Sequence, residues 1–249
     1  MKRVFFSCAL IMLLSGMACA DSIVLYDANL SSQTPSQQSA VWNYGTANNG
    51  TAYFMNDGQD SFTRIDTHDS LADNASYGTI TSPGLNRTLG YTVNARIRIN
   101  AMHPSQTTNY QRGVCDLFVS SDDDQMGVMV RIRTDGIVIN DNTWTTVQSV
   151  FFGAGETDTT EFVDYSLHVQ GTTYTLKADD TEVLSGSLYT YSLATQIRVG
   201  DSTFGGSGIA DLSYVELIRH GVEPIPEPAT VVLILAGITG LVRRKLVRK

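Results

Sequence analysis

Hydrophobic and polar residues alternate along several stretches of this chain. From Tyr91 to Asn100 every second residue is apolar or aromatic, and the residues between them are polar or charged. A period of two over this length is typical of a β-strand with one buried and one exposed face. Met126 to Arg133 repeats the pattern. Both segments are therefore predicted to be strands that cover a hydrophobic core, the first with an inward face of Tyr91, Val93, Ala95, Ile97 and Ile99.

Short polar turns separate the predicted strands. Thr134-Asp135-Gly136 precedes an apolar triplet and indicates a hairpin, and Gly171 lies at the centre of a second one. Asp179-Asp180 predicts a further turn. Residues 27–50 are rich in Ser, Gln, Asn and Thr, so we expect a long loop or a loosely held arm there. Because no segment longer than a turn or two has helical periodicity, the pattern predicts an all-β antiparallel sandwich or barrel.

The N-terminus has the pattern of a secretory signal peptide. Two basic residues precede an apolar segment from Val4 to Leu14, and Ala18-Cys19-Ala20 is a small-residue cleavage site. A lipoprotein signal that uses Cys19 is the alternative, although Gly16 stands where a leucine is usual. We expect residues 1–20 to be removed on export.

The C-terminal segment is apolar and ends in a basic cluster. Pro226-Glu227-Pro228 precedes an apolar run from Ala229 to Val242, and the basic residues that follow include Arg243, Arg244 and Lys245. Such a segment predicts a transmembrane helix with its basic end in the cytoplasm. Together these features resemble the sorting signal of PEP-CTERM proteins of Gram-negative bacteria; an ordinary tail anchor is the alternative. The resemblance implies an exosortase as processing partner, transient membrane anchoring, and delivery to the cell surface or the exopolysaccharide matrix of a biofilm.

Between these signals, residues 21–222 are expected to form one β-sandwich domain, and residues 223–249 the sorting segment. Removing residues 1–20 and everything from Pro226 takes away seven of the 17 basic and one of the 25 acidic residues, which leaves a net charge of −14. A chain this acidic repels nucleic acid. Cys115 then remains as a single cysteine, which excludes an intramolecular disulfide, and we expect it to be buried.

The order of strands in the second half resembles that of concanavalin A-like, laminin-G-type jelly-roll domains. The resemblance depends on the spacing of strand and turn residues rather than on one tight motif. The segments that carry it are Trp144, Tyr165 to Val169, Tyr174 to Leu176, Val183, Ile197 to Asp201 and Tyr214 to Leu217. It implies two curved antiparallel sheets, one of them concave and often sugar-binding, with a calcium site at the rim in some members.

One acidic segment has the spacing of a glycosidase motif. Glu156, Asp158 and Glu161 follow the E-x-D-x-x-E spacing of the catalytic strand in family-16 glucanases, which share the jelly-roll fold. Two carboxylates on one strand face, about 5–5.5 Å apart, are what a retaining glycosidase requires. However, the intervening residues here are threonines, where that family has apolar residues. The segment also follows a glycine pair, which favours an exposed loop.

Two acidic turns are candidate calcium sites. Asp122, Asp123 and Asp124 lie between two predicted strands, and Asp141 lies in another turn. Oxygen ligands on loops are what Ca²⁺ takes in proteins. Neither turn has the spacing of an EF-hand, and a solvated turn is the alternative.

Four arginines occupy the polar faces of the two strongest strands. If these strands are neighbours, Arg96, Arg98, Arg131 and Arg133 form a basic stripe suited to carboxylate or sulfate groups of an acidic polysaccharide. The alternative is cross-strand pairing with acidic neighbours. Trp42 is a candidate for stacking on sugar rings.

The sequence thus predicts an exported, non-enzymatic β-sandwich protein of the cell surface or matrix that binds carbohydrate. A glycoside hydrolase that uses Glu156 and Glu161, and a purely structural surface protein, are the alternative functions. No G-x-S-x-G, C-x-x-C or H-E-x-x-H motif is present, and the four histidines have no metal-ligand spacing.

Overall fold

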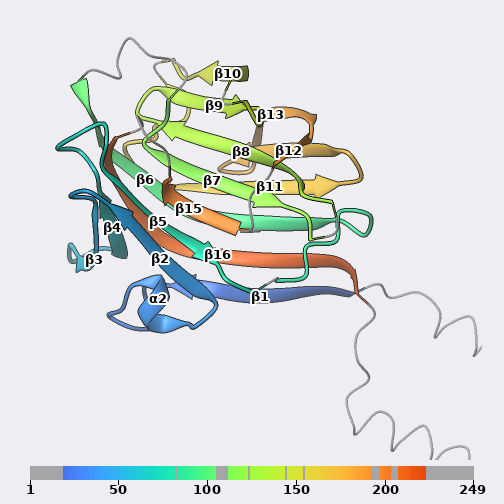
Figure 1. Ribbon diagram of the computed structural model, residues 1–249, viewed down its shortest axis with the longest axis horizontal. Helices are drawn as coiled ribbons and strands as arrows, with labels where there is room; N and C mark the ends of the chain where they lie inside the picture. The colour runs from blue at the N-terminus through green and yellow to red at the C-terminus, as the bar shows by residue number, and fades with distance from the viewer. Residues whose placement is uncertain are drawn as a thin grey trace, which may run out of the picture. The chain divides into compact units, whose positions relative to one another are not determined.

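Two antiparallel β-sheets pack face to face in the computed structural model of this protein (Figure 1). The structure describes residues 19–81, 83–104, 112–122, 124–143, 145–153, 155–191, 197–202 and 207–222. Within these ranges the chain is almost entirely strand, turn and loop, with one short helix, α2 (Pro35–Gln38). The predicted all-β two-sheet sandwich is therefore confirmed.

The first sheet, called sheet A, contains the two longest strands at its centre. Its strand order is β13 (Thr181–Ser187), β12 (Thr173–Ala178), β11 (Val163–Gln170), β6 (Tyr91–Met102), β16 (Gly208–Val222), β4 (Ser61–Asp66) and β3 (Thr51–Asn56). The N-terminal strand β1 (Cys19–Asp27) also pairs with β16. Strands from both ends of the domain thus meet in the middle of one sheet, a non-local pairing that requires the whole domain to fold together.

The second sheet, called sheet B, covers the inner face of sheet A. Its order is β10 (Thr146–Phe151), β9 (Gly136–Asn140), β8 (Met126–Arg133), β7 (Cys115–Ser120), β15 (Ile197–Asp201), β5 (Asn74–Thr79) and β2 (Trp42–Ala47). A two-residue strand, β14 (Tyr189–Thr190), pairs with β8. The chain passes repeatedly between the sheets, so residues that are far apart in sequence become neighbours on each face.

Alternating residues of β6 form the centre of the core, as predicted. The five residues of its inward face are at most 2% exposed. From the facing sheet, Val128, Val130 and Ile132 of β8 are fully buried against this layer. Each such side chain contributes about 1.5–3 kcal/mol through its removal from water. Cys115 lies in the same core, and burial raises the pKa of its thiol.

The predicted turns are confirmed by the backbone. Gly136 begins β9 directly after the predicted Thr134-Asp135 turn, and Gly171 lies between β11 and β12 with φ +60°. Asp179 and Asp180 connect β12 to β13 with φ +47° and +64°. Two consecutive positive φ angles are the geometry of a type I′ hairpin turn, which Asp tolerates better than most residues.

Part of the segment predicted to be a loop is structured. Residues 27–50 contain α2, which has Pro35 in its first turn, and all of β2, which pairs with β5 along its full length. The prediction of one long loop is therefore wrong. Trp42 and Tyr44 alternate in this segment and pack in or against the core, a signal that the surrounding polar residues obscured.

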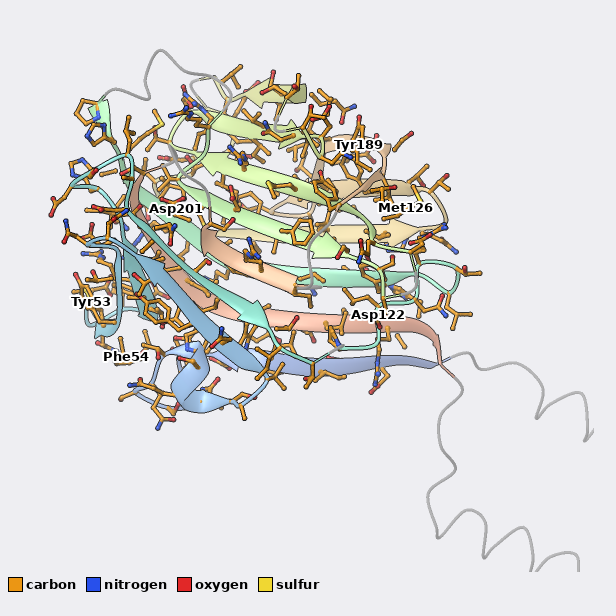
Figure 2. The ribbon with its side chains drawn as sticks, viewed as in Figure 1. Tyr53, Phe54, Asp122, Met126, Tyr189 and Asp201 are labelled. Carbon is orange, nitrogen blue, oxygen red and sulfur yellow. The ribbon has the colours of Figure 1, made fainter. Side chains whose placement is uncertain are left out.

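The outer face of β7, β8 and β9 is covered, which the sequence pattern does not predict. Phe118 and Met129 point away from the main core, yet both are fully buried and pack with Tyr191. β14 lies along the start of β8, where Tyr189 packs against this small apolar cluster (Figure 2). The outer face of sheet B is therefore open mainly over β15, β5 and β2.

The two predicted export signals fall largely outside the described residues. These are residues 1–18 of the signal peptide and the whole of 223–249, with Pro226, Glu227, Pro228, Arg243, Arg244 and Lys245. Among the residues that are described, no helix has the length and apolar character needed to cross a membrane.

Candidate functional site

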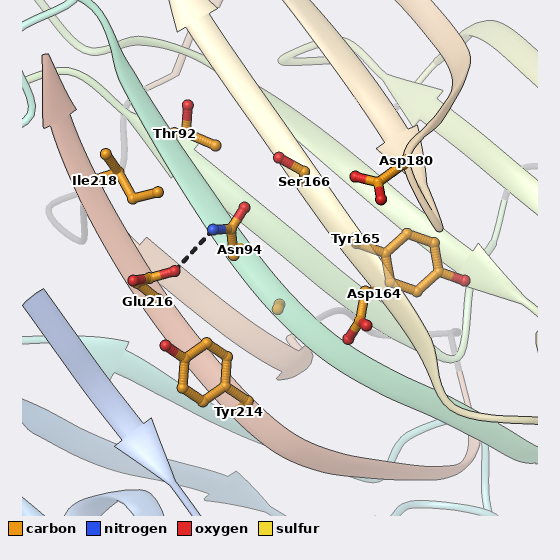
Figure 3. Close-up of a pocket in the computed structure, with 10 residues that line it drawn as sticks. Thr92, Asn94, Asp164, Tyr165, Ser166, Asp180, Tyr214, Glu216 and Ile218 are labelled. Carbon is orange, nitrogen blue, oxygen red and sulfur yellow. Dashed lines mark hydrogen bonds between the residues drawn. The ribbon is translucent and has the colours of Figure 1, made fainter. Parts of the chain in front are cut away.

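A cavity of about 550 Å³ opens on the outer face of sheet A (Figure 3). Its lining comes mainly from the three central strands β6, β11 and β16, together with the β12–β13 turn. Seven of the ten lining residues present polar side chains: Thr92, Asn94, Asp164, Ser166, Asp180, Tyr214 and Glu216. Side chains on sheet strands are held more precisely than those on loops, which favours a binding site with fixed geometry.

Strand register places these side chains in rows across the sheet. Asn94 on β6 lies between Ser166 on β11 and Glu216 on β16. In the next row, Arg96 lies between Asp164 and Tyr214. Because neighbouring residues of a row are about 5 Å apart, their polar groups converge on the same small space.

Hydrogen bonds fix the carboxylate at the floor of the cavity. Asn94 Nδ2 donates to Glu216 Oε2 at 2.8 Å, the contact drawn in Figure 3, and Ser22 Oγ donates to Glu216 Oε1 at 2.5 Å. Tyr214 lies beside Glu216, and its pKa is raised by burial and by the negative charge of Glu216. The tyrosine therefore stays neutral at physiological pH, as a hydrogen-bonding group with an aromatic face.

Two histidines share one threonine beside the cavity. Thr92 Oγ1 is 3.1 Å from His168 Nδ1 and 2.9 Å from His220 Nε2, and the two rings meet edge to face. Burial, together with the neighbouring His168, lowers the pKa of His220. A smaller depression continues from Thr92 past His168 to Lys177. The polar surface thus extends over four strands of sheet A.

These groups suit a neutral ligand that carries several hydroxyl groups. Carboxylate and amide oxygens accept hydrogen bonds from hydroxyls, the Asn94 amide and the Thr92 and Ser166 hydroxyls can also donate, and Tyr214 offers a ring face. Asp164, Asp180 and Glu216 together give the cavity a negative charge, which disfavours an anionic ligand.

The predicted basic stripe does not form. Arg96 and Arg98 lie on β6 in sheet A, whereas Arg131 and Arg133 lie on β8 in sheet B. The prediction of one stripe is therefore wrong, because the strands are not neighbours.

The first two arginines stack with phenylalanine rings at the far end of sheet A. The Arg98 guanidinium lies 4.4 Å from the Phe162 ring centroid and 5.0 Å from that of Phe62. Arg98 also donates two hydrogen bonds to the buried Asp211. Arg96 lies over Phe162 and 3.6 Å from a carboxylate oxygen of Asp60. Both arginines are thus held by aromatic rings and carboxylates of the protein itself.

The other two arginines are buried and paired. Arg131 is 3% exposed and its Nε lies 3.6 Å from Asp116 Oδ1. Arg133 is fully buried, and it donates to Asp135 Oδ1 at 2.7 Å and to the Arg112 carbonyl at 2.8 Å. The prediction that Arg131 and Arg133 contact a ligand from an open polar face is wrong, because that face is covered.

Trp42 is a core residue rather than a sugar-stacking surface. It is 3% exposed, and its indole Nε1 donates to the Leu25 carbonyl at 2.8 Å. Because the ring is buried and its N–H already has an acceptor, Trp42 cannot stack on a sugar, and the predicted contact with sugar is wrong. Trp144, which is part of the jelly-roll resemblance, lies outside the described residues.

The E-x-D-x-x-E segment lies in the loop between β10 and β11 and not on a strand. Glu156 Oε2 accepts a hydrogen bond from the Gly153 N–H at 2.6 Å. Asp158 Oδ1 accepts from the N–H and the hydroxyl of Thr160, which lowers the pKa of Asp158. Glu156 and Asp158 thus stabilise their own loop, and Glu161 is exposed. The shared strand face that the catalytic hypothesis requires is not formed.

The acidic turns are used by the protein itself. Asp124 pairs with Arg87, whose Nε donates to it at 2.8 Å. Asp141 accepts three hydrogen bonds from Thr143 and Thr145, which lower its pKa. Asp122 lies beside Asp124 in the β7–β8 turn, and Asp123 is outside the described residues. Within the ranges described, no three His, Cys, Asp or Glu side chains are grouped to hold a metal ion.

Comparison with known proteins agrees with the architecture. No protein-family model matches the chain, and no curated protein matches its sequence. An endo-β-1,3-glucanase from Pyrococcus furiosus is similar in structure, with a TM-score of 0.50 and 11% identity over 82% of this chain and 96% of that one. A protein of unknown function from Shewanella oneidensis MR-1 has a TM-score of 0.48 and 11% identity, and the match covers 90% and 98% of the two chains. At this identity the likeness shows the fold alone, and that fold is an antiparallel jelly-roll sandwich.

Proposed function

We propose that this chain is an exported, non-enzymatic carbohydrate-binding protein, and that the cavity on sheet A binds a neutral sugar. The observation that carries the proposal is the polar cavity itself, in which Glu216 is held by Asn94 and Ser22 on adjacent strands. A sugar presents many hydroxyl groups and a flat apolar ring face. The cavity offers fixed acceptors for the hydroxyls and the Tyr214 ring for the face.

Binding is favoured over hydrolysis by the positions of the carboxylates. Glycosidases need an acid and a second carboxylate that flank the scissile bond, about 5–5.5 Å apart for retention and about 6.5–9.5 Å apart for inversion. Glu156 and Asp158 instead accept hydrogen bonds within their own loop. This use of the carboxylates supports a binding role. A test must distinguish that role from a family-16-like hydrolase and from a purely structural protein.

The proposed localisation of the protein rests on its N-terminal and C-terminal segments. A signal peptide over residues 1–20 and the Pro226-Glu227-Pro228 motif with its apolar and basic tail support export, an exosortase as partner, and a transient membrane anchor. A polysaccharide of the cell surface or the extracellular matrix is the proposed ligand source. The acidity of the chain argues against a nucleic-acid partner.

The test is a glycan-array screen of the purified full-length chain in a detergent without a sugar headgroup, with and without EDTA. We expect binding to neutral glycans that is weakened in Tyr214→Ala and Asn94→Ala and unchanged in the control Ser149→Ala, an exposed residue of β10. EDTA tests the predicted calcium site. Release of free sugar, abolished by Glu156→Gln, would establish the hydrolase instead. A blank array would leave the structural role.

A further inference from the structure

A second groove, of about 360 Å³, crosses the open part of the outer face of sheet B. It runs over β15, β5 and β2, which lie side by side in the front sheet of Figure 1. The residues that line it include Asn43, Gly45, Asn74, Ser76, Gly78 and Arg198. The volume is at the lower end of the range of ~300–1,000 Å³ for small-molecule sites.

Small residues in adjacent rows of the sheet create the depression. In one row Ser76 on β5 is paired with Gly45 on β2. In the next row Gly78 separates Arg198 from Asn43. A Cβ atom added to Gly45 would meet no atom within 4 Å, so this glycine borders open space.

Arg198 lines this groove and has no hydrogen-bond or ion-pair partner among the residues that the structure describes. Ile197 and Val199 on either side are fully buried in the core, so the alternation of the strand directs Arg198 outward. In the described chain its guanidinium makes no hydrogen bond and no ion pair. The nearby Asp116 is already engaged by Arg131 and by Ser202 Oγ, which donates to it at 2.8 Å.

The partly buried guanidinium of Arg198 is suited to bind an anion. Burial lowers the pKa of Arg198, because the charge is held partly away from water, and the negative charge of Asp116 offsets only part of this effect. By contrast, the arginines at positions 64, 87, 98, 131 and 133 each have a carboxylate within 4 Å. A bound anion would give Arg198 the partner that those residues obtain from the protein, in the planar two-donor geometry that suits carboxylate and sulfate.

We propose that this groove binds an acidic sugar residue, with its carboxylate or sulfate on Arg198. The side chains of Asn43, Asn74 and Ser76 line the same space and offer amide and hydroxyl groups for the sugar hydroxyls. Ile80, which is 62% exposed at the groove, provides an apolar contact for the ring. The proposal extends carbohydrate binding to a second site and is independent of the cavity on sheet A.

The experiment is calorimetric titration of the full-length chain in the same detergent. The probes are tetramers of glucuronate, galacturonate and mannuronate, a sulfated galactan tetramer, and carboxyl-reduced uronate tetramers. We expect at least one acidic tetramer to bind. Arg198→Met should weaken that binding by at least about tenfold, the value of one hydrogen-bonded charge contact. Gly45→Phe should abolish it by filling the groove.

The control Arg96→Met removes one positive charge from the opposite sheet and should leave acidic-sugar binding unchanged. The melting temperatures of the Arg198 and Gly45 variants should not fall below that of the wild type, which shows that both variants are folded. The proposal is overturned if no acidic tetramer binds, or if Arg198→Met and Gly45→Phe bind as tightly as the control. The Tyr214→Ala variant separates the two proposals. If it loses neutral-sugar binding but keeps acidic-sugar binding, the result concerns the cavity of sheet A and leaves the groove of sheet B unaffected.

Discussion

A buried carboxylate holds the polar end of sheet A together. Asp211 is fully buried and accepts hydrogen bonds from Arg64, Arg98 and Asn100 at 2.7–3.1 Å. The guanidinium groups of Arg64 and Arg98 also lie 5.4 and 5.0 Å from the centroid of the Phe62 ring. Two cations around one anion are stable only while the anion is present, so Asp211 is the residue on which this cluster depends.

We predict that Asp211→Asn lowers the free energy of unfolding by about 3 kcal/mol. The amide keeps the size of the side chain but removes the charge, so Arg64 loses its carboxylate partner and Arg98 keeps only Asp57, 3.3 Å away. Urea denaturation followed by circular dichroism measures the change. The matched control is Asp60→Asn, whose half-exposed partner Arg96 lies 3.6 Å away, and it should cost less than about 1 kcal/mol. Equal effects of the two substitutions would contradict this account.

At the level of residues, the sequence predicts which face of a strand a side chain occupies, but not which residue of another strand it contacts. Alternation correctly placed Arg96, Arg98 and Asn94 on the polar face of β6. It did not show that Asp211 would lie opposite Arg98, or Glu216 opposite Asn94, because those pairs depend on the register between β6 and β16. That register shifts twice along the strand pair, and a one-residue slip moves every side chain to the other face. The candidate site was therefore not predictable from spacing alone.

At the level of elements, the side chain of Gln148 connects the two sheets at one edge. Gln148 on β10 donates from Nε2 to the Ser185 carbonyl on β13 at 3.0 Å, and it accepts a hydrogen bond from the Tyr174 hydroxyl on β12. β10 and β13 are the edge strands of sheets B and A. Strands at open sheet edges are prone to fraying and to pairing with other chains. The two hydrogen bonds of Gln148, here called the Gln148 clamp, connect the edge of sheet B to sheet A at this position.

We predict that Gln148→Ala destabilises the protein by about 1–2 kcal/mol, because the Tyr174 hydroxyl loses its acceptor and the Ser185 carbonyl loses its donor. Amide hydrogen exchange should accelerate in β10 and β13 and remain unchanged in β6 and β16. Ser149→Ala, on the exposed side of β10, serves as the control and should leave both sets of amides unchanged. Uniform acceleration across all four strands would show that the clamp acts globally instead.

Elements with clean alternation or glycine turns were predictable, and those defined by tertiary contacts were not. β6, β8 and the hairpin turns follow from period two and from local turn chemistry. The sequence predicts a loop where β2 lies, because its two aromatic residues are embedded in polar sequence, and only its pairing with β5 makes it a strand. The burial of both faces of β8 depends on contacts with Phe118 and Tyr191, which no local pattern contains.

At the level of the molecule, the two proposed sites lie on opposite outer faces of the sandwich. The cavity of sheet A is acidic, and the groove of sheet B contains the cationic Arg198. The core between them is closely packed and continuous, with strands from both sheets. Both sites are lined mainly by strands that pack on this core. Each site is therefore expected to keep its geometry whether or not the other site is occupied.

We predict that a neutral glycan identified by the array and an acidic tetramer bind to the same chain together and independently. In calorimetric titrations, saturation with one ligand should change the Kd of the other by less than about twofold, whereas coupled sites typically differ by ~5–150-fold. Tyr214→Ala should weaken only the neutral ligand, and Arg198→Met only the acidic one. Mutual displacement would mean that both ligands use one site, and the assignment of two faces would then be wrong. Simultaneous binding would allow a single domain to connect two chemically different polysaccharides.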